Sequence, residues 1–299
     1  MPVPAITPES PPVPVQETGA STYQGCPNCG EKLVGPYCSR CGEKKIARDD
    51  LSLAFMFRDL VEHFALFDNK IVRTLWALVS KPGLLTQRFI EGGRSRYTKP
   101  LTLFVILNLV FFVIQPHTGL FRYSYQQYTD TDGRRDQVTS KLASTGESEE
   151  SYKARFNARL REQMKSLLIV SVPLFALVML GLFASSGRSF TEHLVFASHV
   201  YAFNLFLLAF ALGIGYRWLL KLMWTFDPLR PLVGAIDGEL ALTTIIIAAM
   251  TTYISLALRR AYKDGLWSSL VRGLVLAASM IILVHVYKNA LFFATLWTT

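Results

Sequence analysis

Long apolar runs separated by short polar connections occupy the last two thirds of the chain. A bilayer core is about 30 Å thick, and a helix needs about 20 mostly apolar residues to cross it. Several of the runs approach or reach this length, which indicates membrane-spanning helices. We predict a mainly α, polytopic membrane protein in which residues 100–299 form the transmembrane domain. Its five predicted spans are residues 101–121, 167–184, 194–215, 240–258 and 269–287.

The first run is ambiguous. Its uninterrupted part, Leu101–Gln115, has 15 residues and lies between Pro100 and Pro116. A run of this length also fits a re-entrant or interfacial element. The aromatic residues that follow are typical of a membrane interface and favour a full span. They are Phe121, Tyr123, Tyr125 and Tyr128.

Residues 45–99 have apolar positions at helical spacing, with polar residues between them. Apolar side chains from Leu53 to Phe67 can share one helix face. A second run, Ile71–Ser80, stops before Pro82, because a proline disfavours helix in the residue before it. We predict two amphipathic juxtamembrane helices that lie on the membrane or pack on the transmembrane domain. An ordinary soluble two-helix unit fits the same pattern.

Two segments lack long apolar runs. Residues 1–22 hold six of the 14 prolines and no Lys or Arg, which predicts a disordered Pro-rich tail rather than a secretory signal. Residues 122–166 form a polar loop between the first two spans. Its end has the pattern of a basic amphipathic helix that leads into the second span.

Composition agrees with this organisation. Hydrophobic residues make up 51% of the chain and charged residues 18%, which excludes a disordered protein and a disulfide-stapled secreted domain. The net charge is +9, but no block is basic enough to resemble a nucleic-acid-binding arm. We therefore expect the lipid bilayer as a partner and no nucleic acid. A homo-oligomer is compatible with the sequence.

Charge also bears on orientation. Residues 42–99 carry 11 Lys and Arg against 7 Asp and Glu, which places the N-terminus in the cytoplasm by the positive-inside rule. With five spans, residues 122–166 then face outward although basic residues lie near the second span, against the same rule. With four spans, they face inward. The sequence leaves the choice open and we retain five.

All four cysteines lie within residues 23–44, in the spacing C-x2-C-x8-C-x2-C. Each CxxC can form a turn that presents two thiolates, and two such turns complete a tetrahedral set that suits Zn²⁺. Four protein ligands leave no open position, so the predicted zinc ribbon is structural. Redox pairs and disulfides are the competing interpretations. The predicted ligands are Cys26, Cys29, Cys38 and Cys41.

The CPNCG and YCSRCGEK segments resemble the short zinc ribbon at the head of many bacterial membrane proteins. Residues 70–103 resemble the signature of a bacterial family known as domain of unknown function 3667. That signature runs from an R-T-x-x-x-L helix through Lys/Arg-Pro-Gly to Gly-x-Arg-x-x-Tyr-x-x-Pro. The matching residues are Arg73, Thr74, Pro82, Gly83, Gly93, Arg94, Tyr97 and Pro100. The resemblance implies a multi-pass protein of the bacterial inner membrane with a zinc site, and no catalytic residues.

Two sets of polar residues are weaker candidates. One lies at the start of the first span, where it forms either a charged collar or an anionic-headgroup site. Its members are Arg94, Arg96, Tyr97 and Lys99. The other lies inside the spans, where it either forms hydrogen bonds between helices or makes a path for protons or a small solute. Its members are Asn108, His199, Asn204 and His285.

The sequence contains no HExxH, G-x-S-x-G, P-loop or GxGxxG motif, so we do not expect an enzyme. The favoured hypothesis is a membrane adaptor or scaffold that recruits a protein partner through its zinc ribbon. The alternative is a small-solute or proton-coupled transporter that uses the polar residues of the spans.

Overall fold

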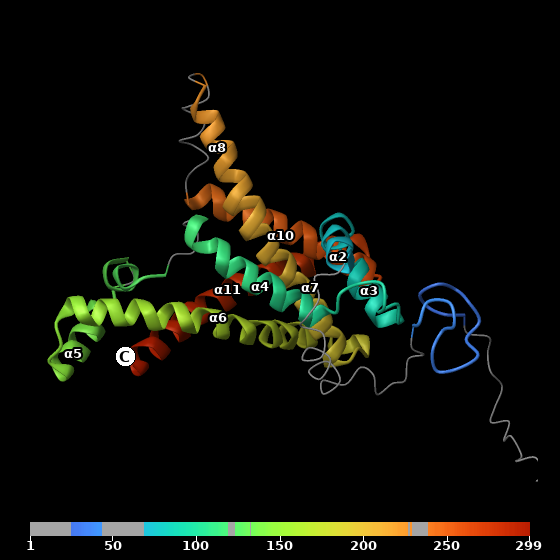
Figure 1. The fold of residues 1–299 in the computed structure, drawn as a ribbon, viewed down its shortest axis with the longest axis horizontal. Helices are drawn as coiled ribbons and strands as arrows, with labels where there is room; N and C mark the ends of the chain where they lie inside the picture. The colour runs from blue at the N-terminus through green and yellow to red at the C-terminus, as the bar shows by residue number, and fades with distance from the viewer. Residues whose placement is uncertain (1–24, 44–68, 119–122, 132, 227, 229–238) are drawn as a thin grey trace, which may run out of the picture.

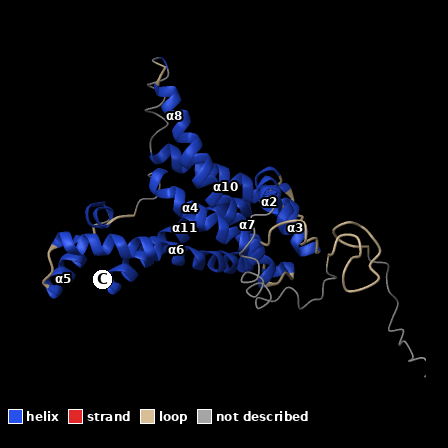
Figure 2. Cartoon of the chain, viewed as in Figure 1, coloured by secondary structure: helices blue, strands red, loops and turns tan. Residues whose placement is uncertain are grey.

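The computed structural model describes residues 25–43, 69–118, 123–131, 133–226, 228 and 239–299. Over these ranges the chain is largely helical, and the β-pairing is confined to isolated bridges such as the one between Gly25 and Lys32 (Figures 1 and 2). The predicted Pro-rich tail and the apolar face between Leu53 and Phe67 lie outside the described residues.

The core of the structure is a bundle of long helices: α4 (Pro100–Thr118), α6 (Glu149–Leu182), α7 (Phe190–Phe206), α10 (Glu239–Ala261) and α11 (Leu266–Thr298). Four helices in the described part are long and apolar enough to cross a membrane, and α6 makes a fifth if its two halves count as one span. Those halves meet at a bend of 47°. The predicted polytopic α-helical class is confirmed.

The third predicted span is longer than expected. Helix α7 continues through a π-helical segment, η4 (Leu207–Tyr216), into α8 (Arg217–Trp224). Ser189 and Glu192 form a reciprocal capping box that starts α7 before the predicted span begins. About 67% of its apolar window is buried, against 28% to 39% for α4, α10 and α11. This helix is therefore the centre of the bundle.

The outside of the bundle is apolar. Large hydrophobic side chains are exposed along α4, α6, α10 and α11, far beyond the patches that a soluble monomer presents. Lipid chains would cover such surface, which supports a membrane domain. Examples are Leu109, Ile169, Val170, Leu177, Ile245, Leu274, Ile281, Ile282 and Val286.

Contacts at the two ends of the bundle show which end each helix reaches. At one end, which we call the ribbon end, Arg188 before α7 donates to the carbonyl of Ala261 at the end of α10 (2.9 Å). At the opposite end, Gln163 in α6 donates to Thr298 at the end of α11 (2.8 Å). The five helices alternate in direction, so the cysteine module and the C-terminus lie at opposite ends (Figure 1).

The stretch we predicted as a polar loop, residues 122–166, is largely helical where it is described. It contains η2 (Gln127–Thr131), α5 (Arg135–Thr145) and the first half of α6. Together with the end of α11 these segments form a body that we call the far lobe. It lies at the opposite end of the bundle from the cysteine module (Figure 1).

Aromatic packing holds the far lobe together. Tyr125 and Tyr128, which we predicted to lie at a membrane interface, are 5% and 0% exposed inside it. Phe156 lies among Tyr125, Tyr128, Tyr152 and Phe292, with ring centroids 5.9 to 6.3 Å away. The predicted interfacial role of these tyrosines is therefore replaced by a packing role. An aromatic cluster that follows a span can fill a core as well as anchor at an interface.

Two short helices pack at the ribbon end. The predicted helix over Ile71–Ser80 is α2 (Asn69–Ser80), and α3 (Leu84–Glu91) follows it. Helix α2 buries Thr74, Ala77 and Leu78, whereas Val72, Trp76 and Val79 are exposed on its other side. It is therefore apolar on two sides, as expected for a helix that packs on the bundle and faces a bilayer.

Candidate metal centre

The four cysteine sulfurs gather at one point. All lie within 4.8 Å of one another, with 3.5 Å between Cys26 and Cys41 and 3.6 Å between Cys29 and Cys38. A tetrahedral ion with metal–sulfur bonds of about 2.3 Å needs ligand sulfurs about 3.8 Å apart. All four cysteines are free rather than disulfide-bonded. The donor set therefore fits a single tetrahedral metal ion and leaves no coordination position open for catalysis.

Two knuckles with the same hydrogen bonds build this centre. In the first, the N–H of Cys26 donates to the carbonyl of Glu31 and the N–H of Gly30 to the carbonyl of Cys26 (2.7 and 2.8 Å). In the second, Cys38 pairs with Glu43, and Gly42 with Cys38 (2.8 and 2.9 Å). Gly30 and Gly42 have φ values of 78° and 71°, in the left-handed region that favours glycine.

The protein supplies hydrogen-bond donors to the sulfurs. The backbone N–H of Glu43 and the side-chain amide of Asn28 donate to Cys41 and lower the pKa of its thiol to about 7, although burial opposes the shift. The pKa of the neighbouring Cys29 thiol is raised, so the proton of this pair stays on Cys29 while Cys41 is the thiolate. A lowered pKa favours the thiolate, which is the form that binds a metal. Donors around the ligands also fix their orientation.

The module is docked on the connection between α3 and α4, residues 92–99, which we call the joint. The carboxylate of Glu43 accepts the backbone N–H groups of Arg94 and Ser95 at 3.2 and 2.9 Å. The side chain of Asn28 donates to the hydroxyl of Ser95 at 3.0 Å. Glu43 is only 4% exposed. A buried carboxylate held by two backbone N–H groups makes a strong, charge-assisted contact.

Metal binding and docking share residues. Glu43 contributes its backbone to the second knuckle and its side chain to the joint. Asn28 likewise contacts both Cys41 and Ser95. A module of this size is too small for a hydrophobic core of its own, so a metal ion bound by the four cysteines would be coupled to its folding. Loss of the metal would therefore release the docking groups as well.

The predicted headgroup residues have different roles in the joint. Arg94 packs its guanidinium over the ring of Phe89 at 4.6 Å and donates from Nε to the carbonyl of Phe89 at 3.2 Å. Lys99 is half-buried, and this burial lowers the pKa of its ammonium group. Tyr97 packs against the main core, whereas Arg96 is exposed. Among these four residues, only Arg96 has an exposed side chain that could reach a lipid headgroup.

Other signature residues hold the joint against the bundle. Thr74 accepts the backbone N–H of Thr98 at 2.9 Å, which ties α2 to the joint. Gly83 has a φ of 78°, and a Cβ there would lie 2.5 Å from the carbonyl oxygen of Ala257 in α10. Only glycine permits both this backbone conformation and this approach. Arg260 of α10 donates to the carbonyl of Pro82 at 3.0 Å.

The polar residues inside the spans have separate environments. His199 is buried and its Nδ1 lies 2.9 Å from the hydroxyl of Thr86 in α3, so it joins two packed helices. Asn108 is 3% exposed, and its amide nitrogen has no hydrogen-bond partner among the described residues. Asn204 is half-buried, and His285 is exposed on α11. His285 therefore lies apart from the buried His199 and Asn108, whereas the predicted path needs all of them on one interior route.

Sequence reasoning missed Glu43 and Asn28 as docking residues. Glu43 follows the glycine of the second knuckle as Glu31 follows that of the first, so the two glutamates look equivalent in sequence. In the structure Glu31 is exposed and forms an ion pair with the exposed Arg40 at 3.6 Å. Burial of one glutamate and not the other could be found only from the fold.

Comparisons with known proteins bear on the same segment. No curated protein and no solved structure matches the chain. A family match covers α2, α3, the joint and most of α4, which is the part of the chain on which the cysteine module docks. Residues 68–112 match the family described as "Protein of unknown function (DUF3667)", which confirms the resemblance found in the sequence.

Proposed function

We propose that this protein is a membrane scaffold of the bacterial inner membrane that recruits a protein partner through a cytoplasmic zinc ribbon. The observation that carries the proposal is the docked cysteine module. Its closed, four-thiolate ligand set is suited to structural Zn²⁺. One of its sides is fixed on the joint, so the module has a defined orientation relative to the bundle.

The remaining surface of the ribbon offers a contact site. Val34 is 91% exposed and Tyr37 is 61% exposed, on the loop between the two knuckles. Two large apolar side chains on so small a module are costly to leave in water. Exposed aromatic and aliphatic anchors of this kind are typical of protein interfaces. We assign the partner contact to this loop.

Chemistry and charge both support the cytoplasmic location. Reduced thiols are maintained in the cytosol, where a four-cysteine metal site is favoured over disulfides. The ribbon end also carries Arg259 and Arg260 in the last turn of α10 and Lys263 in the connection to α11. Basic connections remain on the cytoplasmic side of a membrane. The far lobe would then face the opposite side.

The test is crosslinked co-purification from native membranes, with the wild type compared with a Val34→Ser, Tyr37→Ser variant at matched membrane abundance. These side chains are exposed, so the variant should fold and keep its metal. We expect a stoichiometric partner to be lost from this variant and from a Cys29→Ser, Cys41→Ser variant. Ser39→Ala, an exposed change in the second knuckle, is the control. A partner list that all variants share would contradict the proposal.

The transporter alternative receives less support. A groove lies between the end of α4 and the helix formed by η4 and α8, and none of Asn108, His199, Asn204 and His285 is among its lining residues. The hydrogen bond between His199 and Thr86 is the kind that packs helices together. Alanine substitution of His199 should therefore lower membrane abundance. A variant of full abundance that loses a measured solute flux would instead favour transport.

A further inference from the structure

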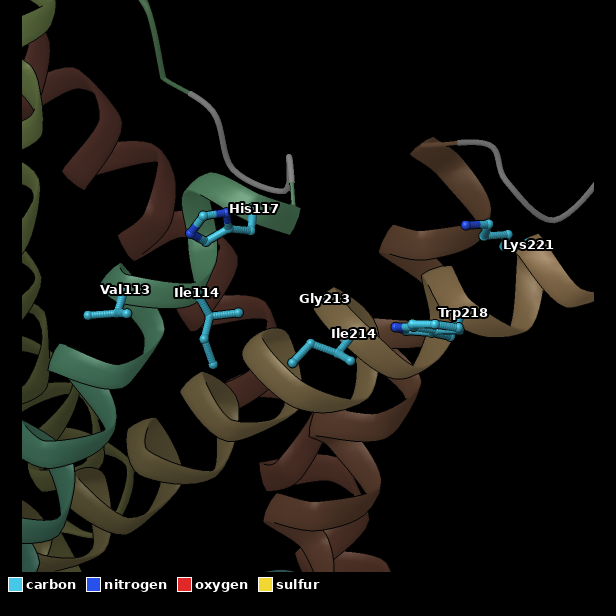
Figure 3. A pocket seen from close by; sticks show the side chains of 7 residues that line it. All are labelled: Val113, Ile114, His117, Gly213, Ile214, Trp218 and Lys221. Atoms are coloured by element: carbon cyan, nitrogen blue, oxygen red, sulfur yellow. The ribbon is translucent and has the colours of Figure 1, made fainter.

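A groove of about 610 Å³ lies between the end of α4 and the helix formed by η4 and α8 (Figure 3). Its walls are mostly apolar and include Val113 and Ile114 of α4 and Ile214 of η4. Val113 is 70% exposed, so the wall is open to the surroundings of the bundle. Neither Asp nor Glu is among the described residues that line the groove.

The groove lies where the bilayer core ends. The apolar window of α4 runs from Pro100 to His117 and spans about 27 Å as a helix. The neighbouring helix, Phe190–Trp224, is about 50 Å long and exceeds the hydrocarbon core. Its last turns, in α8, therefore extend into the headgroup region, on the side opposite the cysteine module.

Two basic side chains and a tryptophan stand at this level. His117 at the end of α4 and Lys221 in α8 lie on opposite walls of the groove, and Val113, Ile114 and Ile214 lie lower in the view of Figure 3. The ammonium of Lys221 lies 5.8 Å from the centre of the Trp218 ring, which is itself 68% exposed. Tryptophan and lysine together are typical of the membrane interface.

The backbone of the groove is also unusual. Ten residues of its second wall, Leu207–Tyr216, are π-helical. Such segments are rare, and they frequently occur at functional sites. Gly213 lies within this segment, where it leaves the wall without a side chain.

The geometry points to a binding site for one anionic phospholipid in this groove. An acyl chain would lie against Val113, Ile114 and Ile214, and the phosphate would lie between Lys221 and His117. The ammonium supplies a charge, and the imidazole N–H can donate a hydrogen bond. A free phosphate would leave the apolar walls exposed, and a zwitterionic lipid would bring a second cation toward Lys221. The site is independent of the ribbon and lies at the other end of the bundle.

Native mass spectrometry of the full chain in detergent tests this site. The probes are phosphatidylglycerol and phosphatidylcholine with identical acyl chains, supplied together in equal amounts. We expect the wild type to retain one phosphatidylglycerol in preference. A His117→Gln, Lys221→Gln variant should reduce the preference about fivefold for the lost lysine charge, since the glutamine amide at position 117 can still donate a hydrogen bond. Val113→Trp should fill the groove and lower the binding of both lipids.

Arg161→Gln is the matched control, because Arg161 is an exposed cation of the far lobe outside the groove. It should leave the lipid preference unchanged. Unchanged preference in the His117→Gln, Lys221→Gln variant would overturn the site. An equal loss in Arg161→Gln would also overturn it, since the effect would then come from overall charge. Full displacement of the lipid by inorganic phosphate would overturn the role of the apolar walls.

Discussion

The cysteine module and the far lobe are attached to opposite ends of one helix bundle, and different forces hold them together. The module has a closed set of four thiols and exposes the apolar side chains of its loop. The far lobe buries an aromatic cluster around Phe156, which is fully buried, and shares it with the end of α11. The cysteine module is too small for a hydrophobic core, so its stability would depend on a bound metal. The far lobe packs against the end of α11, so its stability depends on buried apolar side chains.

Metal removal gives the largest expected difference between the two bodies. A structural Zn²⁺ site contributes about 10–16 kcal/mol to the folding of a small module, so chelation should unfold the ribbon completely. Hydrogen exchange measured by mass spectrometry should show loss of protection in residues 25–43 and unchanged protection in residues 149–164. Restored zinc should reverse the change. Equal loss of protection in both regions would contradict the separation.

Phe156→Ala should produce the opposite result. Removal of a buried phenylalanine costs about 3–5 kcal/mol, because a cavity remains among the surrounding rings. We expect faster hydrogen exchange in α5, in the first half of α6 and at the end of α11, with metal content unchanged. Trp297→Ala, a change at a side chain that is 78% exposed, is the control. A similar effect of both changes would argue against a packed aromatic core.

Gly83→Ala tests whether the ribbon end depends on the close approach between the backbone at Gly83 and that of α10. The left-handed conformation costs about 1–2 kcal/mol for a residue with a Cβ, and contact with the carbonyl of Ala257 adds to this cost. Gly187 has a similar φ of 67°, but no atom of the described residues lies within 4 Å of the place that a Cβ would take, so Gly187→Ala should cost only the first part. The apparent Tm of the purified protein should therefore fall further for Gly83→Ala. Equal shifts would show that the approach to α10 is unimportant.

The structural features that the sequence predicts correctly are local ones. Apolar run length predicts the bundle, because a membrane-spanning helix satisfies its own backbone. Cysteine spacing predicts the metal centre, since two short turns place four sulfurs together. Each of these signals lies within one helix or one turn.

The parts that the sequence does not predict depend on distant contacts. The partner of His199 is Thr86, 113 positions away in the chain, so the sequence could suggest a hydrogen bond between helices but could not name the partner. Tyr128 reaches the carbonyl of Lys288 in α11, which makes it part of a core rather than of an interface. The docking of Glu43 joins residues 51 and 52 positions apart. The pattern of apolar and polar residues cannot tell whether a polar side chain will contact a distant residue or will face solvent.

Glu43→Gln has the smallest expected effect and tests how the metal-held body is attached. The amide keeps the backbone of the second knuckle but loses the charge that accepts two N–H groups, at a cost of about 1–3 kcal/mol. We expect metal content to stay at the wild-type value while hydrogen exchange accelerates in residues 92–96. Glu31→Gln changes the corresponding position of the first knuckle, where the side chain is exposed, and should have no effect. If Glu43→Gln also lost the metal, the glutamate would belong to the metal centre. If exchange in the joint did not change, the ribbon would be held by its remaining contacts, chiefly the one between Asn28 and Ser95.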